Sequence, residues 1–446
     1  MMNKEIKERI ETIKKGKVPD GYIRTKAGLM PCDWIKSKPL TTNMIFENIS
    51  DKNHGNEYPV LSATQEKGIV LRSEIEKDIN FNKENTNSYK LVCKGDYVIS
   101  LRSFQGGIEY SNIDGLVSPA YTVIRPIIPI SDGYYKEYFK TNDFIDRLNS
   151  AIYGIRDGKQ IGYKDFAELA LHNPPLEEQE KIAEILSRCD TVIEECEKQV
   201  EEYKNLKKTC LSKMFPKKGS NIPEIRFPGF TDAWEQRKLG DVLETVTDYV
   251  AAGSFADLAK NVEYKDSPDY AQLVRTMDLK SGFTSTQEVY VDKNAFDYLY
   301  RVNMDKECII LPNIGNCGEV YYVKPENLPY KHNVLGPNAI FVRSETAANN
   351  FLSILFQAKD FQAKLKLIVS PNGQTKFNKT ELKRIDLILP ADVHEQEKIE
   401  EYFSTLDNLI TLHQRKVNAY TQMKKALTQL LLTGIVRVNK QKEILP

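Results

Sequence analysis

The pentapeptide EQEKI occupies residues 178–182 and occurs again at residues 395–399. Each copy opens a segment that aligns with the other without a gap, and identical residues recur along both. The identical pairs include Asp190 and Asp407, Ile193 and Ile410, Val200 and Val417, Tyr203 and Tyr420, and Lys207 and Lys424. Self-similarity at a fixed period indicates repetition of one structural unit. The chain of 446 residues is therefore predicted to consist of two related halves.

Each repeated segment is predicted to form one long helix. Pro174-Pro175 and Pro390 stand just before the two segments, where a helix start tolerates proline, and glutamates fill the first turns, where the helix dipole favours anions. Apolar residues then recur at alternating spacings of three and four, which predicts a heptad seam. The predicted seams are Ile182, Ile185, Cys189, Val192, Cys196, Tyr203, Leu206 and Cys210, and Ile399, Tyr402, Leu406, Leu409, His413, Tyr420, Met423 and Leu427.

Gln199 and Lys416 interrupt the two seams at matching places, and Val200 and Val417 follow one residue later. This pattern predicts a local slip in register. A helix of this length cannot bury its seam alone, so the two helices are expected to pack against each other, antiparallel, as a coiled coil.

The regions that precede the two helices, residues 20–175 and 223–390, have a different pattern. Short β-branched and aromatic runs, bounded by Gly, Asn and Pro, predict strands at 97–101, 121–124, 308–311 and 339–342. Ser118-Pro119 leading to Arg125 resembles Gly336-Pro337 leading to Arg343, and Trp34 resembles Trp234. The predicted fold class is α+β: two mixed α/β domains joined by two long antiparallel coiled-coil helices, as a pseudo-twofold internal repeat.

Composition excludes several classes of protein. Lys+Arg and Asp+Glu both number 62, so a protein that coats DNA nonspecifically is disfavoured, although a local basic face remains compatible with this balance. Seven cysteines without a CxxC pair argue against a disulfide framework or a structural zinc site. The first 17 residues are charged and have no apolar core, and no apolar run approaches a membrane span. A cytoplasmic location is expected.

Two motifs invite a catalytic interpretation. Asn173-Pro174-Pro175-Leu176 resembles the Asn/Asp-Pro-Pro-aromatic motif of amino-methyltransferases, but its fourth residue cannot stack on a flipped base, and no glycine-rich donor loop precedes it. Asp269 and Asp278 fit only a loose metal-nuclease pattern that is common by chance. The five histidines have no metal-ligand spacing. We predict neither a catalytic residue nor a metal site.

Polar side chains in the turns of the two globular regions are a better signal. Arg and Lys suit guanine edges and phosphates, Asn and Gln suit adenine, and Ser and Thr suit either. An ordinary polar loop is the alternative for any one of these residues. The candidate DNA-binding residues are Ser62, Gln65, Lys67, Arg102, Ser103, Gln105, Tyr153, Arg156, Lys159 and Gln160 in the first half, and Arg275, Thr276, Asn313, Asn316, Lys331, Asn333, Gln374 and Lys376 in the second.

With these motifs in place, the sequence resembles the specificity subunits of type I restriction–modification systems over nearly its whole length. The resemblance rests most strongly on the Pro–Glu-Gln–Ile block, which occurs twice, each time after a variable region and before a long helix. Further marks are Gly21-Tyr22 with Thr25, Gly28, Pro31 and Trp34; YPVLS at 58–62; GLVSPAY at 115–121; RFPGF at 226–230; and Trp234 with Gln236, Arg237, Lys238 and Leu239. The second helical segment begins one residue later after its proline than the first.

The resemblance implies an organisation and a set of partners. Residues 1–19 would be a lead-in helix, 20–175 and 223–390 two target-recognition domains, 176–222 and 391–436 helical spacers, and 437–446 a tail. The chain would read a bipartite double-stranded DNA target without catalysis or a cofactor of its own. Two methyltransferase subunits would carry S-adenosylmethionine, and motor–nuclease subunits would use ATP and Mg²⁺. Gln179 and Gln396, with the seam residues above, would belong to the spacer and partner surface.

Two other functions remain to be separated from this one. A stand-alone adenine methyltransferase would transfer methyl groups as the lone chain. A purely structural coiled-coil adaptor would retain the helices but would give the two variable regions no DNA to read.

Overall fold

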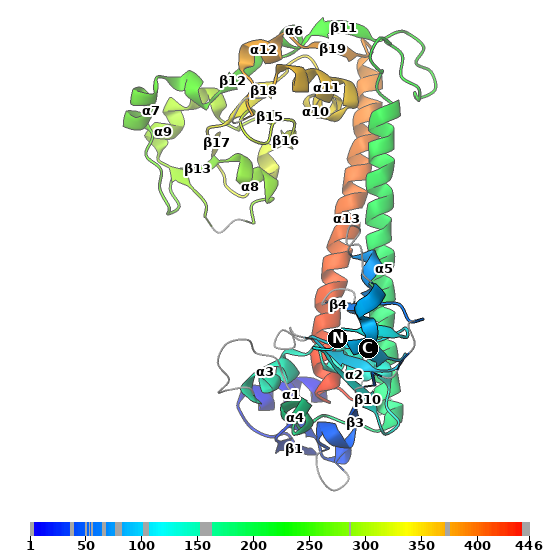
Figure 1. The fold of residues 1–446 in the computed structure, drawn as a ribbon. Helices are drawn as coiled ribbons and strands as arrows, with labels where there is room; N and C mark the ends of the chain where they lie inside the picture. The colour runs from blue at the N-terminus through cyan, green and yellow to red at the C-terminus, as the bar shows by residue number, and fades with distance from the viewer. Residues whose placement is uncertain are drawn as a thin grey trace. The chain divides into compact units, whose positions relative to one another are not determined.

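The computed structural model describes residues 4–35, 40–49, 51–52, 54, 57–64, 68–75, 83–100, 107–151, 163–284, 287–370 and 375–438. The chain divides into two compact units (Figure 1). Unit 1 comprises Met1–Glu197 and Arg415–Pro446, and unit 2 comprises Lys198–Gln414. The division falls inside two long helices, so each unit contains one globular region together with a part of both helices.

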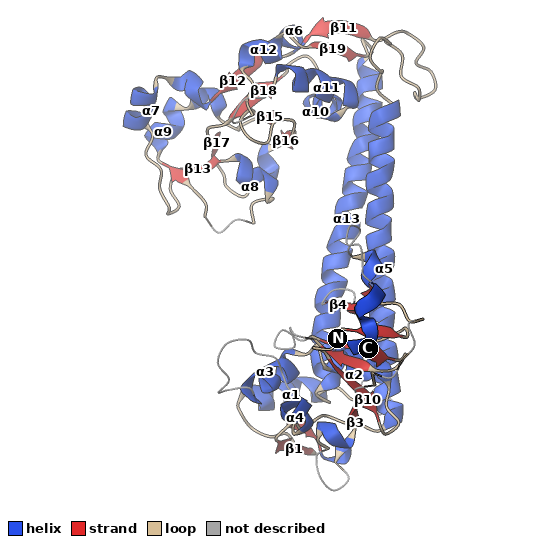
Figure 2. Ribbon diagram, in the orientation of Figure 1, coloured by secondary structure: helices blue, strands red, loops and turns tan. Residues whose placement is uncertain are grey.

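The two long helices are α5 (Leu176–Lys213) and α13 (Val393–Leu432), drawn in blue in Figure 2. At a rise of about 1.5 Å per residue, the 38 residues of α5 extend about 57 Å. Both helices begin directly before the repeated EQEKI block, as the sequence predicts.

Burial along the two helices follows an unbroken heptad. On α5 the buried or half-buried seam is Ile182, Leu186, Cys189, Ile193, Cys196, Val200, Tyr203, Lys207 and Cys210, and Met214 continues it directly after the helix. On α13 it is Ile399, Phe403, Leu406, Ile410, His413, Val417, Tyr420, Lys424, Leu427 and Leu431. Each residue of the second series is the repeat counterpart of one in the first, with a constant offset. The buried seam is therefore repeated, position by position, in the two halves of the chain.

This seam corrects the predicted one. Val192, Leu206 and Met423 were placed in it, but they are 37%, 42% and 47% exposed. The neighbouring Ile193, Lys207 and Lys424 occupy the seam instead, and the slip expected after Gln199 does not occur. The reason is physical: a seam sought among apolar residues alone excludes a lysine that is packed through its stem and paired at its tip, so the heptad phase is lost.

The two seam lysines form matching ion pairs between the helices. Within unit 2, Lys207 Nζ lies 2.7 Å from a carboxylate oxygen of Asp407, and within unit 1, Lys424 Nζ lies 2.7 Å from Asp190. Burial lowers the pKa of Lys424, but its hydrogen bond to Asp190 and the charges of Glu137 and Asp190 outweigh this effect and raise it. Both lysine side chains are 18% exposed.

Contacts inside unit 2 give the direction of the helices there. Tyr203 packs on His413 with ring centroids 5.4 Å apart, Lys207 pairs with Asp407, and Cys210 Sγ lies 3.5 Å from the Tyr402 hydroxyl. Residue numbers rise along α5 as they fall along α13, so these two helix segments run antiparallel.

The globular region of unit 1 is built on a four-stranded antiparallel sheet with the order β3-β10-β7-β8. Two-stranded pairings β1-β2, β4-β5 and β6-β9 surround it. The strands are β1 (Tyr22–Thr25), β2 (Gly28–Pro31), β3 (Phe46–Ile49), β4 (Leu61–Thr64), β5 (Gly68–Leu71), β6 (Lys90–Val92), β7 (Tyr97–Ile99), β8 (Ile108–Tyr110), β9 (Gly115–Val117) and β10 (Thr122–Pro126). The short helices are α1 (Lys4–Lys14), α2 (Asp132–Tyr138), α3 (Asn142–Ala151) and α4 (Tyr163–Ala167).

The globular region of unit 2 repeats this plan. Its four-stranded antiparallel sheet has the order β12-β18-β15-β16, and a second sheet, β14-β13-β17, and the pair β11-β19 accompany it. The strands are β11 (Glu235–Lys238), β12 (Thr245–Asp248), β13 (Ala271–Val274), β14 (Tyr290–Val291), β15 (Cys308–Pro312), β16 (Tyr321–Val323), β17 (Asn333–Leu335), β18 (Ala339–Arg343) and β19 (Asp386–Leu389). The helices are α6 (Leu239–Val242), α7 (Phe255–Asn261), α8 (Thr276–Lys280), α9 (Lys293–Tyr298), α10 (Asn349–Gln357), α11 (Lys359–Ile368) and α12 (Lys379–Lys383).

The two sheets correspond strand by strand. In each unit, the first strand of the sheet in chain order (β3 or β12) pairs with the last (β10 or β18). The last strand also pairs with β7 or β15, and the short strand β8 or β16 forms the other edge. The four predicted strands are β7, β10, β15 and β18, which occupy the two central positions of each sheet. Packing explains why these runs could be recognised in the sequence, because most residues of a central strand are buried and apolar.

The glutamate of each EQ block is buried in an ion pair with an arginine that follows the other long helix. Glu178 is fully buried and accepts from Arg437, 2.8 Å away, and from the Trp34 indole. Glu395, 1% exposed, accepts two hydrogen bonds from Arg226, at 2.6 and 2.7 Å. The Glu395 hydrogen bond raises the pKa of Arg226. Each pair ties a helix start to the chain beyond the end of the other helix.

The adjacent glutamine holds the turn before each helix. Gln179 donates to the Asn173 side chain and to the Pro174 carbonyl, both at 2.9 Å, and Gln396 donates to the Pro390 carbonyl at 2.9 Å. The repeated EQ pair therefore serves the frame of the protein.

Removing one member of such a pair should destabilise unit 2. We predict that Arg226→Met lowers the free energy of unfolding by about 3 kcal/mol, because it leaves the Glu395 carboxylate buried without its cation. The double substitution Arg226→Met/Glu395→Gln should recover most of that loss, since no charge then remains buried. Thermal and denaturant unfolding followed by circular dichroism measures both. Equal instability of the single and double variants would show that the ion pair is not the cause.

Candidate nucleic-acid interface

The sheet β12-β18-β15-β16 of unit 2 gathers several loops at one edge. Because neighbouring strands are antiparallel, the end of β12, the start of β18 and the end of β15 meet there, through the pairs Asp248 with Ile340 and Pro312 with Ala339. Loops at a sheet edge are positioned by the rigid strands and carry binding residues more often than the strands themselves.

Backbone hydrogen bonds join three of these loops. The Asn313 amide donates to the Asn338 carbonyl at 3.1 Å, and the Phe377 amide donates to the Asn313 carbonyl at 3.1 Å. The Gly315 amide donates to the Thr375 carbonyl at 2.9 Å, and the Thr375 hydroxyl donates back to the Gly315 carbonyl at 2.7 Å. Asn338 has a φ of 70°, a left-handed conformation that asparagine tolerates better than most residues.

Helix α8 joins the same group of loops. The Gly336 amide donates to the Val274 carbonyl at 2.8 Å, which places the end of β13 beside the turn before β18. Lys280, at the end of α8, forms an ion pair with Glu319 at 2.8 Å. We call residues 275–280, 313–319, 336–338 and 375–377 the loop cluster.

The loop cluster brings together five of the predicted DNA-binding residues: Arg275, Thr276, Asn313, Asn316 and Lys376. Asn316 and Lys376 are exposed, whereas Arg275, Thr276 and Asn313 are half-buried. Asn313 also donates from its side chain to the Phe377 carbonyl, so part of its polarity serves the loop itself.

Two further predicted residues of unit 2 lie elsewhere. Asn333 is 4% exposed at the start of β17, and its amide donates to the Tyr330 carbonyl at 2.7 Å, so it holds a turn rather than facing solvent. Lys331 is exposed and lies just before the start of β17, away from the loop cluster. Ten predicted residues lie outside the described part of the chain: Gln65, Lys67, Arg102, Ser103, Gln105, Tyr153, Arg156, Lys159, Gln160 and Gln374.

Ser62 of unit 1 occupies the position that Arg275 occupies in unit 2. Val60 pairs in parallel with Leu116, three residues before Pro119, and Leu273 pairs in parallel with Val334, three residues before Pro337. Ser62 and Arg275 each follow the paired residue by two positions. The sequence nominated both residues but gave no sign that they are equivalent, since the pairing is long-range.

Asp278 was missed as a contributor to this surface. It is 1% exposed, and both of its oxygens accept from the Arg275 guanidinium, at 2.8 and 2.9 Å. This hydrogen bonding raises the pKa of Arg275. The spacing of three residues between Arg275 and Asp278 was the signal available in the sequence.

The carboxylates of the weak nuclease pattern are occupied. Asp278 holds Arg275, and Asp269 accepts from Lys265 at 2.5 Å and from the Tyr270 amide at 2.6 Å. Across the described residues, no group of three or more His, Cys, Asp or Glu side chains is arranged to hold a metal ion.

The methyltransferase-like motif is likewise occupied by internal contacts. The Asn173 side-chain oxygen accepts from the Tyr135 hydroxyl and from Gln179, both at 2.9 Å, and Pro174 is buried. Asn173 thus anchors the turn before α5, as the helix-start interpretation predicts.

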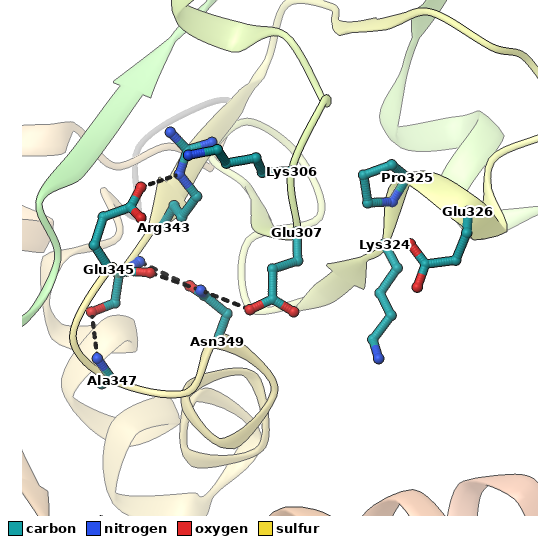
Figure 3. A pocket seen from close by; sticks show the side chains of 10 residues that line it. Lys306, Glu307, Lys324, Pro325, Glu326, Arg343, Glu345, Ala347 and Asn349 are labelled. Carbon is teal, nitrogen blue, oxygen red and sulfur yellow. Dashed lines mark hydrogen bonds and ion pairs between the residues drawn. The ribbon is translucent and has the colours of Figure 1, made fainter.

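A hollow of about 480 Å³ lies at the other end of the unit 2 sheet, where β15 begins and β18 ends (Figure 3). Three of its charged groups have partners: Arg343 lies 3.1 Å from Glu345, and Glu307 accepts from Asn349 at 3.2 Å and from Tyr322.

The loop cluster, by contrast, offers groups of the kind that recognise nucleic acid. Guanidinium, ammonium, amide and hydroxyl groups lie together at one edge, and base edges and phosphates are read by these donors and acceptors. A hollow of about 440 Å³ adjoins it, lined in part by Gly315, Cys317, Gln362 and Thr375. No helix in the described part of the chain has the length and apolar character needed to cross a membrane.

Comparison with known proteins also points to recognition of DNA. The sequence matches the type I restriction modification DNA specificity domain twice, over residues 37–202 and 231–422. It is 24% identical over 365 residues to the type I restriction enzyme MjaVIII specificity subunit of Methanocaldococcus jannaschii, covering 79% of this chain and 82% of that one. It is also 24% identical to the putative type I restriction enzyme MjaX specificity subunit of the same organism, over 94% of this chain and 97% of that one.

A solved chain from work on complex assembly and conformational transition of the type I restriction–modification system has the same fold, with a TM-score of 0.53 and 13% identity over 94% of this chain and all of that one. The family match covers both halves of the repeat and most of the chain. The protein therefore belongs to the family of type I restriction–modification specificity subunits, which recognise DNA sequence and are not themselves catalytic.

Proposed function

We propose that this chain reads a bipartite double-stranded DNA target, one half-site with each globular region, and docks the methyltransferase subunits that modify it. The observation that carries the proposal is the repetition of one sheet plan with different residues at its edge. Arg275 stands in unit 2 where Ser62 stands in unit 1. Two readers of one design with different reading residues are suited to two different half-sites.

The long helices are proposed to form one antiparallel coiled coil with a pseudo-twofold relation between the repeats. Support comes from the matching seams, from the paired Lys207–Asp407 and Lys424–Asp190 contacts, and from the exchange of arginines onto Glu178 and Glu395. Every one of these interactions occurs twice, once for each repeat.

Apolar residues left exposed on the helices support two docking sites of one kind. Leu206 and Met423 are repeat counterparts and are 42% and 47% exposed, and the counterparts Leu176 and Val393 are 38% and 50% exposed. An apolar side chain repeated on the solvent side of a helix is suited to bury itself in a partner. Two equivalent places fit two copies of one methyltransferase subunit.

Cofactors would reside on these partners. S-adenosylmethionine would bind the methyltransferase subunits, and ATP with Mg²⁺ would bind motor–nuclease subunits that join the complex. The occupied state of Asn173 and Asp278 supports this division of labour, because neither side chain is available for substrate or metal in the folded chain.

The lone chain should have no methyltransferase activity and should gain it when a methyltransferase subunit is added. The assay is transfer of a tritiated methyl group to DNA by each protein alone and by the mixture. Methyl transfer by the lone chain that Asn173→Ala abolishes would establish the rival function, a stand-alone adenine methyltransferase.

The docking surfaces should be separable. We expect Leu206→Asp to remove one methyltransferase subunit from the complex, Met423→Asp to remove the other, and the double variant to bind neither, because each places a charge in an apolar contact. Native mass spectrometry counts the subunits. Asn205→Asp and Gln422→Asp, exposed repeat counterparts one residue away, are the matched controls and should retain two. Loss of both subunits from one single variant would contradict two independent sites.

The two readers should be exchangeable one at a time. Replacing residues 20–175 with the corresponding region of a relative should change one half of the methylated sequence and leave the other intact. Sequencing of methylated DNA from cells with each chain measures the result, and the same exchange of residues 223–390 is the reciprocal control. A change in both halves after one exchange would argue against independent reading. Random-sequence binding by the assembled wild-type complex would favour the structural adaptor.

A further inference from the structure

We infer that Arg275, held by Asp278, requires a guanine at one position of the half-site read by unit 2, and that Ser62 is the matching base-reading position of unit 1. The inference rests on the proposed function. It specifies guanine as the base that is read, Arg275 as the residue that contacts it, and Asp278 as the residue that positions the arginine.

The guanidinium of Arg275 is fixed on one side. Its Nε donates to Asp278 at 2.9 Å, its Nη2 donates to the other Asp278 oxygen at 2.8 Å, and Nη2 also donates to the Gln287 carbonyl. The Arg275 amide donates to Asp278 as well, at 2.8 Å, at the start of α8. A long side chain that is usually mobile is therefore held in one orientation before any DNA arrives.

The remaining nitrogen is the group left for a ligand. Nη1 carries two N–H donors and has no hydrogen-bond partner among the described residues, while the Arg275 side chain remains 24% exposed. The residue lies in the loop cluster, beside the turn before β18, through the Gly336–Val274 hydrogen bond. Because Nη1 is held in one place, its N–H donors are suited to a ligand that presents its acceptor atoms at one defined position.

Charge decides between a phosphate and a base. The buried Asp278 carboxylate neutralises much of the guanidinium charge, which weakens any attraction to a phosphate, because that attraction is Coulombic. Its N–H donors are retained. A base edge with acceptors is the better ligand for such a group.

Among the bases, guanine fits a pure donor. Its major-groove edge presents two neighbouring acceptors, N7 and O6, whereas adenine and cytosine each present an amino donor and thymine a methyl group beside O4. Arginine has no acceptor with which to satisfy an amino group. The equivalent serine at position 62 both donates and accepts, so it permits different bases in the other half-site.

The residue that positions the arginine is specific to unit 2. Three residues after Arg275 stands the carboxylate of Asp278, whereas three residues after Ser62 the sequence has Gln65, which carries no charge. The two readers therefore differ in the reading residue and in its support.

The test uses the full chain assembled with its methyltransferase subunits, on DNA carrying the methylated sequence of the wild-type complex. Replacing the guanine by 7-deazaguanine removes the N7 acceptor and should weaken binding about tenfold at that one position. Hypoxanthine there, which alters only the minor-groove amino group, should have little effect. The Arg275→Ala complex should accept any base at that position and should be indifferent to 7-deazaguanine, with the other half-site unchanged.

Further variants separate reading from folding. Asp278→Asn should relax the guanine requirement in part with Arg275 intact, since the arginine loses its support, and Ser62→Ala should alter base preference only in the other half-site. Arg237→Ala, an exposed arginine paired with Glu235 on β11, is the control and should keep the wild-type sequence.

The possible results are distinct. A wild-type complex without any defined target would defeat the proposed function itself. A defined target whose unit 2 half-site lacks guanine, or one that Arg275→Ala leaves unchanged, would overturn the inference alone. Uniform loss of affinity for every sequence would assign Arg275 to the phosphate backbone and would also overturn it. An affinity of the wild-type complex that 7-deazaguanine leaves unchanged at every guanine of the unit 2 half-site would overturn the inference even if a variant fails to fold.

Discussion

Two lysines that point across the helical seam onto aspartates of the other helix fix how this chain is assembled. Lys207 meets Asp407 in unit 2 and Lys424 meets Asp190 in unit 1, and neither pair can form if the helices shift by a turn. Half-exposed ion pairs add little stability, but a polar group within an apolar seam specifies register and orientation. With that register set, Arg437 can reach Glu178 and Arg226 can reach Glu395, so the chain segment after each helix closes on the start of the other.

The repeat, both long helices and the central strands could be predicted because their signals are local and strong. EQEKI recurs without a gap, and β7, β10, β15 and β18 are rich in β-branched and aromatic residues. The phase of the seam could not be predicted, because Lys207 and Lys424 are packed through their stems and only the partner aspartate explains their burial. A pattern that counts apolar residues places Leu206 and Met423 inside, and the structure places them outside.

The types of residue in the candidate site could be predicted from the sequence, but which of these residues lie together in space could not. Asn313, Asn316, Thr276, Arg275 and Lys376 come together only through hydrogen bonds between strands and loops that are distant in sequence, such as Phe377 to Asn313. Asn333 has the same chemistry but is buried against Tyr330, and nothing local distinguishes it. Asp278 was weighed as a metal ligand because an isolated carboxylate gives no sign that a neighbouring guanidinium already holds both of its oxygens.

The frame and the loop cluster therefore draw on separate residues. Glu178, Gln179, Glu395 and Gln396 have their side chains committed to arginines and to the turns before the helices, and none of them belongs to the loop cluster at the sheet edge. A loop residue such as Arg275 can then be exchanged without disturbing an interaction that sets the register. Because Val60 and Leu273 have equivalent parallel pairings, the position two residues later carries a serine in unit 1 and a supported arginine in unit 2. Physical independence of the two sets is what allows one scaffold to hold different loop residues in its two units.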